Sequence, residues 1–564
     1  VVLWAVWHGL RPIALTIFIF MALAGPGASL ILPMLDRWST TDASRAARER
    51  PYQSTRTQFT RRAFAVDQVI DADSSKVPPM TRQEAARGVS NWDQAALMRT
   101  AAISRRDLTA IASSWTPGPQ GLTALIVQRP TSGSGPTTLT SLNVTSADEQ
   151  GRPLPALPGQ AETDESFPTV LVEPGAPAYA IVADSADDMP AAPFASWFDR
   201  LAHAWSLQKP SVLAHDVPEL RPRILLHRDV RERIAALAPF LTIGPTLQSA
   251  VAADSLYWLA ELFVTSDEYP LAQPLLFAGE PRQDGGGSRF SYIRHAATAV
   301  VHAHTGRVFI VADRGPDPVM RSWMQRFPWL FVSRDRLPAA LGALWPPPVD
   351  RAAVQGDAIA HAGFPGDTII PTRVAASRES APDAPPLLYA QHGDAGPLSA
   401  SIAVLESGER MVGVLLARGG REPGVEWHRA ASKIPWRGVL DELSASAKRA
   451  GMYGTKRGAD RRGFVQILPF SDGLGFTQSF YSWGSDAPPA LHGVVLLEGG
   501  RSHPGATFAE ALGISRPVPE GASVAFRSRV AALYETMRAA MRRGDWKVFG
   551  DAYATLGRLL HAAP

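Results

Sequence analysis

The sequence contains no cysteine among its 564 residues. This absence excludes disulfide bonds, catalysis by a thiol and zinc sites built from thiolates. Lysine and arginine are scattered along the chain and form no run interleaved with aromatic residues, and the net charge is only +3. A nucleic-acid-binding surface needs a concentration of positive charge. We therefore expect no nucleic acid among the partners.

The motifs of several large enzyme classes are also absent. No GxSxG sequence places a serine at a strand-to-helix turn, and no GxxxxGK[ST] loop is present for nucleotide phosphates. The triplet Gly285-Gly286-Gly287 lacks the spacing of a dinucleotide-binding loop. We therefore assign no catalytic residue and no cofactor, and we favour a protein that is not an enzyme.

One pair of histidines has a spacing that metal sites use. His302 and His304 are two residues apart, and such residues share one face of a strand. His304 adjoins the turn residues Thr305 and Gly306, and no third ligand follows at a suitable distance. We expect ordinary hairpin histidines here and no metal site.

An uncharged run of 23 residues, from Ile13 to Leu35, stands near the start of the sequence. At about 1.5 Å per residue, a helix of this length crosses the hydrocarbon core of a bilayer. A secretory signal is the alternative, because Ala22-Leu23-Ala24 resembles a cleavage triplet. The apolar run continues well past Ala24. We therefore expect a retained transmembrane helix over residues 13–35.

The densest core-forming sequence extends from Leu256 to Phe331. Two apolar runs, Leu256–Thr265 and Ala299–Ala312, predict buried strands, and the turn His304–Arg307 makes the second a hairpin. We expect a long loop and a short helix between the first strand and the hairpin. Apolar residues at helical spacing from Met320 to Phe327 predict a closing helix.

The same stretch contains the candidate binding residues, which are Asp267, Tyr269, Tyr292 and Arg294. Arg294 precedes an apolar run, and a buried guanidinium requires a carboxylate partner. We expect Asp267 to be that partner, because the turn at Tyr269-Pro270 can direct its side chain back to the sheet. Glu261 and Glu268 are further candidates for a buried polar cluster. A structural ion pair is favoured over a catalytic one.

The alternation of strand and helix patterns predicts an α+β fold behind the transmembrane helix. With 45% hydrophobic residues the chain can form sizeable cores. The segment Phe194–Leu213 has helical periodicity and is expected to pack as a helix. We predict four further regions: a helical segment 36–115, an α+β core domain 116–345, an extended Pro/Ala-rich connection 346–397, and a second α+β segment 398–564 that ends in two helices. Within the connection, a helix is the alternative for Ala358–Phe364.

Three segments of the central stretch carry a resemblance to a known family. They read VTSDEYPLAQ, SYIRHAATAVVHAHTGRVFIVAD and DPVMRSWMQRFPWLF, in this order. ERPYQSTRTQFTRRAFAVDQV at 49–69 adds to them. The sequence resembles uncharacterised protein family 0182, which consists of bacterial multi-pass membrane proteins with a large extracytoplasmic region. The resemblance implies that this chain corresponds to the last transmembrane helix and the soluble region.

The distribution of charge around the predicted helix disagrees with this topology. Arg37, Arg45, Arg48 and Arg50 follow the helix and only Arg11 precedes it, so a positive-inside count places the large domain in the cytoplasm. Long domains are translocated largely regardless of charge, and earlier helices set the topology of a multi-pass protein. We therefore follow the resemblance and expect a cell-membrane protein with its large domain on the extracytoplasmic side.

Three functions remain open at this point. The first is a membrane-anchored, non-enzymatic envelope protein, whose partners are the lipid bilayer and either another envelope protein or the cell wall. The second is the extracytoplasmic part of a transporter or channel. The third is an envelope hydrolase or transferase. The family that the sequence resembles has no established activity, so the resemblance does not choose among them.

Overall fold

The computed structural model describes residues 42–561 with gaps, together with residues 9, 16 and 20. The gaps are 75–78, 119–120, 132–136, 149–150, 156–162, 168, 184–190, 215–221, 278–287, 366–388, 392–396, 407–409, 454–458, 485–486 and 515–521. Apart from Thr16 and Phe20, the predicted transmembrane helix 13–35 lies outside the described residues. Among the helices that are described, none is both long and apolar enough to cross a bilayer.

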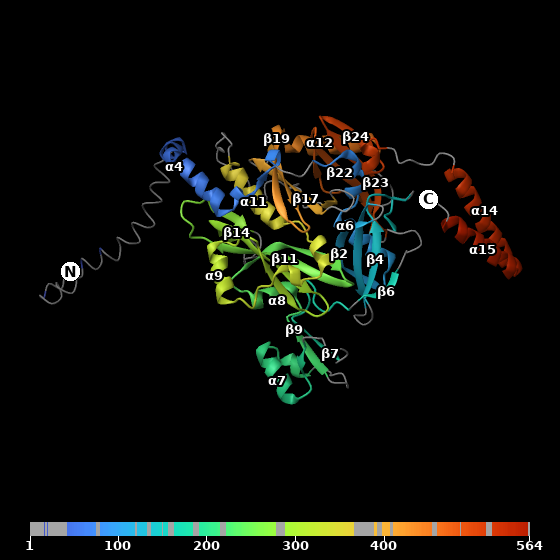
Figure 1. Ribbon diagram of the computed structural model, residues 1–564, viewed down its shortest axis with the longest axis horizontal. Helices are drawn as coiled ribbons and strands as arrows, with labels where there is room; N and C mark the ends of the chain where they lie inside the picture. Colours follow the sequence, from blue (N-terminus) through green and yellow to red (C-terminus); the bar gives the residue numbers. More distant parts are fainter. Residues whose placement is uncertain are drawn as a thin grey trace.

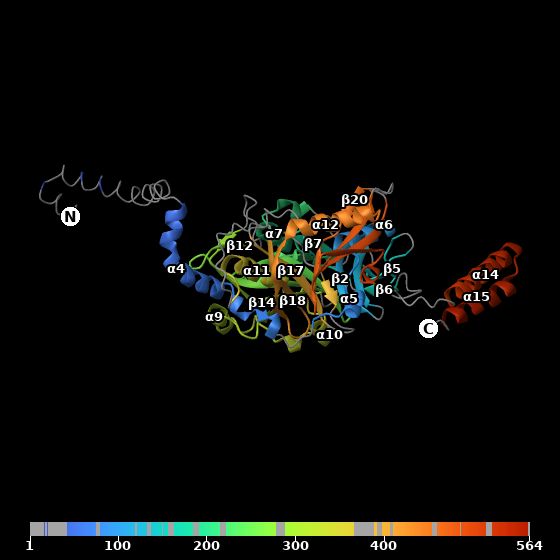
Figure 2. The same cartoon turned by 90° about the horizontal axis from the view of Figure 1, so that it is seen from above.

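The described chain is a mixed α+β structure, which confirms that part of the predicted fold class. Its main body contains four sheets of four or five strands with helices on and between them, and α14 and α15 stand apart at the C-terminal end (Figures 1 and 2). The α-helices are α4 (Asp42–Ala63), α5 (Arg82–Gly88), α6 (Gln94–Ser104), α7 (Trp197–Ser206), α8 (Val230–Leu237), α9 (Pro318–Arg326), α10 (Ala339–Ala343), α11 (Val349–Ala362), α12 (Trp436–Arg449), α13 (Phe508–Ala511), α14 (Ala522–Arg543) and α15 (Trp546–His561).

The central sheet is antiparallel and follows the order β10-β11-β14-β15. These strands are β10 (Thr242–Ala252), β11 (Ser255–Ser266), β14 (Tyr292–His302) and β15 (Val308–Ala312). The predicted first strand, hairpin and closing helix α9 are confirmed. The short helix expected before the hairpin is wrong, because residues 292–298 continue β14. β14 lies between β11 and β15, and this pairing overrides the helix preference of its alanines.

A second sheet lies beside the central one and follows the order β1-β19-β18-β17-β16. Its strands are β1 (Ile70–Asp71), β16 (Tyr389–Gln391), β17 (Leu398–Glu406), β18 (Arg410–Arg418) and β19 (Gly424–Pro435). Helix α11 packs against β17 and β18 and also contacts β10 and β14. It lies within residues 346–397, for which we expected an extended connection, and most of its side chains are buried. α11 therefore joins the two sheets.

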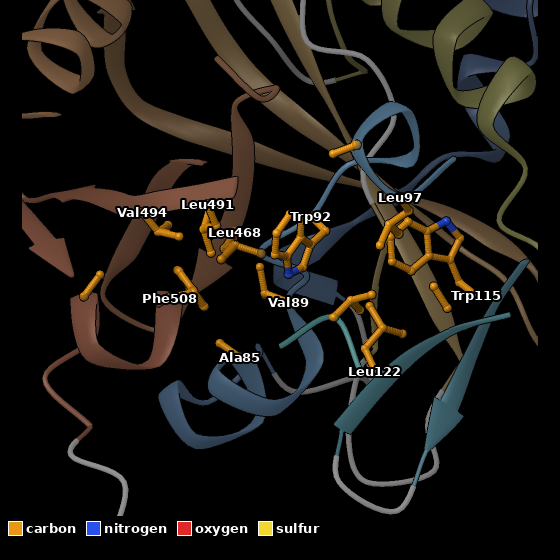
Figure 3. Close-up of a cluster of buried hydrophobic side chains, with 14 of the residues drawn as sticks. Ala85, Val89, Trp92, Leu97, Trp115, Leu122, Leu468, Leu491, Val494 and Phe508 are labelled. Atoms are coloured by element: carbon orange, nitrogen blue, oxygen red, sulfur yellow. The ribbon is translucent and has the colours of Figure 1, made fainter. Parts of the chain in front are cut away.

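Two further sheets share a core near the C-terminal side of the body. One contains β2 (Leu108–Gly118), β3 (Gly121–Pro130), β4 (Thr137–Asn143), β5 (Leu154–Pro155) and β6 (Thr163–Phe167). The other contains β20 (Ala459–Arg462), β21 (Gln466–Phe470), β22 (Gly473–Trp483), β23 (Ala490–Glu498) and β24 (Arg501–Gly505). Figure 3 shows Val89 and Trp92 of the N-terminal part beside Leu468, Leu491 and Phe508 of the C-terminal part. Segments far apart in the sequence therefore build one core.

The helical segment expected over 36–115 ends earlier in the structure. Helices α4, α5 and α6 lie within residues 42–104, with the short strand β1 between α4 and α5, and β2 begins at Leu108. Two small sheets complete the described set. One pairs β12 (Leu275–Phe277) with β13 (Ser288–Phe290), and the other has the order β7-β9-β8, with β7 (Tyr179–Ala183), β9 (Pro222–Leu226) and β8 (Ala192–Pro193). Short 3-10 helices cover Val66–Gln68, Ala72–Ser74, Pro210–Ala214 and Arg334–Arg336.

Helix α7 belongs to a small unit that projects from the body with β7, β8 and β9 (Figure 1). Its own core is small and consists of Phe194, Ala204, Val212 and Ile224 with their partly buried neighbours. The helix expected within Phe194–Leu213 is present, but much of its apolar face is not packed. Trp197, Phe198 and Trp205 are 62%, 76% and 83% exposed. The unit has too few described apolar residues to cover them.

Candidate functional site

A β-bulge in β14 places His295 on the same face of the central sheet as Glu261. Leu262 lies opposite Ala297, whereas Phe263 lies opposite His295, so Ala296 is an additional residue in β14. Directly opposed residues of antiparallel strands point to one face, and a one-residue shift reverses the side chains that follow. His295 therefore contacts Phe263 edge to face, with ring centroids 5.4 Å apart.

Asp313 holds the imidazole of His295 in place. Asp313 directly follows β15, and its backbone N–H donates to the carbonyl of Ala296 at 3.0 Å. Its carboxylate lies 2.7 Å from Nδ1 of His295, which makes Nδ1 the protonated nitrogen when this carboxylate is charged. Nε2 of His295 lies 3.7 Å from Oε2 of Glu261. Asp313, His295 and Glu261 thus form a row of acid, imidazole and acid in the sheet.

Glu261 connects this row to the start of helix α11. Its Oε1 accepts the backbone N–H of Asp350 at 2.8 Å, and its Oε2 accepts that of Arg351 at 2.9 Å. A carboxylate at a helix N-terminus satisfies unpaired N–H groups and complements the helix dipole. The carboxylate of Asp350 in turn accepts the N–H of Thr246 at 2.9 Å. These contacts attach α11 to the central sheet.

The close approach of α11 requires a glycine in β10. A Cβ atom at Gly244 would lie 2.3 Å from the carboxylate oxygen of Asp350. This separation is far below a van der Waals contact, so alanine at this position would push Asp350 and the helix end away.

Burial and neighbouring charges shift the pKa values of this cluster. Burial raises the pKa of Glu261 to about 7, and the carboxylate of Asp350 adds to the rise. Burial disfavours a charged His295, but Asp313 and Glu261 outweigh burial, so the pKa of His295 is raised. Burial alone would raise the pKa of Asp313, but the neighbouring His295 holds the pKa of this carboxyl below its ordinary value. The cluster can therefore hold a proton near neutral pH and exchange it with a bound group.

The cluster borders a cavity of about 870 Å³. The cavity lies between the central sheet and the second sheet, and Glu261, His295 and Asp313 line it together with Trp345. Four arginines also line it: Arg314, Arg334, Arg351 and Arg418. A volume of this size is within the range of ligand-binding sites.

The four arginines differ in how far their donors are already used. Arg314 is largely exposed and pairs with Glu422, while Arg418 pairs with Glu426. Arg334 lies over the ring of Trp345, 4.0 Å from its centroid, and donates to the backbone carbonyl of Arg421 at 2.9 Å.

Arg351 is half-buried, and its backbone N–H is the donor to Glu261. Its guanidinium has no hydrogen-bond or ion-pair partner among the described residues. Its charge helps to lower the pKa of Asp313 without a direct contact, so its donors stay available for an anionic ligand in the cavity.

The residues predicted as a binding site are only partly brought together. Tyr269 and Tyr292 pack ring to ring with centroids 5.2 Å apart, and the guanidinium of Arg294 lies over Tyr292, 5.7 Å from its centroid. Asp267 is exposed and does not join them. Burial, followed by the charge of Asp317, raises the pKa of Tyr292.

The predicted buried pair of Arg294 and Asp267 is wrong. Nε of Arg294 donates to the backbone carbonyl of Arg62 at 3.1 Å, and Nη2 donates to the same oxygen. Arg294 is half-buried, so the penalty that would demand a carboxylate is not reached. Arg294 instead joins the C-terminal end of α4 to the central sheet. Of the alternative carboxylates, Glu268 is exposed and Glu261 belongs to the buried cluster.

The two spaced histidines support the hairpin turn. Nδ1 of His302 accepts the backbone N–H groups of His304 and Thr305, each at 3.2 Å, and Nδ1 of His304 lies 2.8 Å from the carbonyl of Thr169. Their rings are 6.4 Å apart. Within the described residues, no three or more side chains of His, Asp or Glu are arranged so that they could hold a metal ion.

Sequence reasoning missed His295, Asp313, Asp350 and Arg351. His295 stands beside Arg294 in the same segment, but only the bulge turns it toward Glu261. Asp350 and Arg351 closely follow three consecutive prolines. Proline at this position is a sequence signal for the start of a helix. Their contact with Glu261 spans about 90 positions of sequence and has no local signal.

The central segment also identifies relatives. Residues 189–360 match the model of an uncharacterised protein family, UPF0182. Over these residues the chain is therefore similar to uncharacterised protein family 0182. The matched residues include Glu261, His295, Asp313, Asp350 and Arg351, so the buried cluster lies within the family region.

Curated UPF0182 proteins from several bacteria are similar to the chain over stretches of comparable length. One from Mycobacterium tuberculosis (strain ATCC 25177 / H37Ra) is 31% identical over 169 residues, which is 29% of this chain and 17% of that protein. One from Thermobifida fusca (strain YX) is 30% identical over 152 residues, covering 25% of this chain and 15% of that protein. One from Synechococcus sp. (strain CC9311) is 32% identical over 160 residues, covering 26% and 16%.

The matched stretches thus span less than a fifth of the length of these curated UPF0182 proteins. No solved structure matches this chain.

Proposed function

We propose that this chain is the membrane-anchored, extracytoplasmic part of an envelope protein, and that its body binds a small anionic ligand in the cavity of about 870 Å³. The uncharged run Ile13–Leu35 and the family's membrane topology support the anchor and its orientation. The cavity supports ligand binding by the body. In this proposal the domain is a receptor and not an enzyme.

The observation that carries the proposal is the unpartnered guanidinium of Arg351 at the wall of the cavity. The carboxylates that line the same cavity already have partners. Glu261 accepts two backbone N–H groups, and Asp313 is held by His295. Two further lining carboxylates, Asp335 and Glu422, contact Ser333 and Arg314. Arg351 is thus a cation without a direct contact at the cavity wall, which favours a negatively charged guest.

The ligand should carry a carboxylate or phosphate on a larger polar body. Arginine binds such groups through two parallel N–H bonds, and Arg334 with Trp345 offers a flat surface for the rest of the molecule. An anionic fragment of the cell envelope has this chemistry. Engagement of the cell wall would then occur through the cavity.

Titration calorimetry of the full chain with citrate and inorganic phosphate tests this proposal, with glucose as an uncharged probe. We expect binding of at least one anion, no binding of glucose, and a Kd for Arg351→Gln that is at least about tenfold weaker, as for the loss of a charged hydrogen bond. The exposed Arg321→Gln is the matched control and should bind as the parent does. Absence of anion binding, or equal binding by Arg351→Gln, would overturn the proposal.

The Asp313–His295 pair favours a second candidate, an envelope hydrolase or transferase. A carboxylate-oriented imidazole is the usual general base for activating a nucleophile. Hydrolysis of p-nitrophenyl phosphate or acetate by the full chain, lost in His295→Gln, would establish this candidate. If the unsubstituted chain binds anions but hydrolyses neither ester, the result would support the receptor and contradict the hydrolase.

A further inference from the structure

The C-terminal helices α14 and α15 form a hairpin beside the body (Figures 1 and 2). Ala540 and Ala552 are buried in the contact between the two helices, at 0% and 6% exposure. The carboxylate of Asp545 caps α15 by accepting the N–H of Val548 at 3.2 Å. The hairpin is therefore a defined unit, although two helices alone bury only one stripe each.

One side of the hairpin exposes large apolar side chains. On α15 the rings of Trp546, Phe549 and Tyr553 form a strip, with successive centroids 6.0 Å and 6.3 Å apart. On α14, Tyr534 and Met541 are seven residues apart and share one face. Trp546 is 68% exposed, Tyr553 64%, Tyr534 59% and Met541 54%.

These side chains lie on the same side of the hairpin. Met541 directly follows the buried Ala540, and Tyr553 directly follows the buried Ala552, so each is turned about 100° from the helix contact. Because the two helices run in opposite directions, these equal rotations point to one side. The described side chains of the hairpin thus form an aromatic face, which consists of Tyr534, Met541, Trp546, Phe549 and Tyr553.

The hairpin also concentrates positive charge. Residues 522–561 contain seven Lys and Arg against three Asp and Glu, a net charge of +4, whereas the whole chain carries +3. The rest of the chain is therefore slightly negative. Arg538, Arg542 and Lys547 are exposed on this unit.

We propose that the hairpin lies flat on a bilayer that contains anionic phospholipids, with its aromatic face in the interface. Trp and Tyr are enriched at the level of the lipid headgroups. Amphipathic helices with basic residues and an aromatic face bind there through buried apolar area and attraction to anionic lipid. A second copy of the hairpin is a poorer occupant, because two units of charge +4 repel each other. This contact is independent of the cavity and of residues 13–35.

The absence of cysteine allows a local test in the full chain. We would place one cysteine at Met541→Cys, on the aromatic face, and label it with a fluorophore that is sensitive to polarity. Asp551→Cys is the matched control, because Asp551 precedes the buried Ala552 and lies on the other side. Each labelled chain is reconstituted in vesicles of phosphatidylglycerol or of phosphatidylcholine.

We expect the emission at position 541 to shift to shorter wavelength in phosphatidylglycerol and to be quenched by lipid-borne nitroxides, with little change at position 551. Replacing Arg542, Arg543 and Lys547 by Gln together should raise the lipid concentration needed for this shift at least tenfold, with the helix content unchanged by circular dichroism. An equal shift in both lipids would overturn the role of charge. No shift at 541, or a shift that follows protein concentration in detergent, would overturn the membrane contact, and the latter would indicate self-association.

Discussion

The buried carboxylate of Glu261 should make the fold sensitive to pH. Its pKa increases from 4.5 to about 7 on folding, so the folded state binds more protons in this interval and the free energy of unfolding falls as pH rises through it. The raised pKa of His295 acts in the same direction above its ordinary value of 6.5. The lowered pKa of Asp313 acts only below 3.8, outside this interval.

We therefore predict that Glu261→Gln reduces the loss of stability between pH 5 and pH 8. The change should be on the order of 3 kcal/mol, from a shift of two to three pKa units. Chemical denaturation at both pH values measures it. Glu422→Gln is the control, because the side chain of Glu422 is 82% exposed. An unchanged pH dependence in Glu261→Gln would show that other groups carry it.

Arg294 illustrates how a residue can matter without a buried ion pair. Its guanidinium donates twice to the carbonyl of Arg62 and covers Tyr292. We predict that Arg294→Ala lowers the free energy of unfolding by about 1–2 kcal/mol, as the loss of a charged hydrogen bond does. Arg294→Lys should recover little, because a single ammonium cannot replace the planar donors. Urea denaturation would measure both, and a loss of 3–5 kcal/mol would restore the buried-pair interpretation.

At the scale of elements, the position of α11 depends on a glycine in β10. We predict that Gly244→Ala costs about 1–3 kcal/mol, because its Cβ would meet the carboxylate of Asp350 at 2.3 Å. Gly342→Ala in α10 is the matched control, since nothing lies within 4 Å of its Cβ and alanine favours a helix. Thermal unfolding of the two variants compares them. Equal stability would mean that α11 can shift without cost.

At the scale of the whole molecule, the predicted topology places the C-terminus outside the cytoplasm. A reporter enzyme that is active only outside the cytoplasm, fused after Pro564, should therefore be active in cells. A reporter enzyme that is active only in the cytoplasm, fused at the same position, should show no activity. The reverse result would support the positive-inside count from Arg37, Arg45, Arg48 and Arg50.

Local sequence patterns predicted much of the architecture. The apolar run Leu256–Thr265 forms β11, the turn His304–Arg307 joins β14 and β15 in a hairpin, and the two C-terminal helices are present. These features depend on periodicity and turn residues within a few positions of one another, which a sequence displays directly.

The buried cluster was decided only by the tertiary structure. The extra residue Ala296 in β14 turns His295 toward Glu261, and α11 brings Asp350 and Arg351 to the same carboxylate. Sheet register and the meeting of distant segments have no local signal, and local signals alone therefore predict Asp267 as the partner of Arg294. The burial of a side chain also depends on the tertiary structure. Glu261 is enclosed because two sheets meet over it, while Asp267, six positions along the chain, is exposed to solvent.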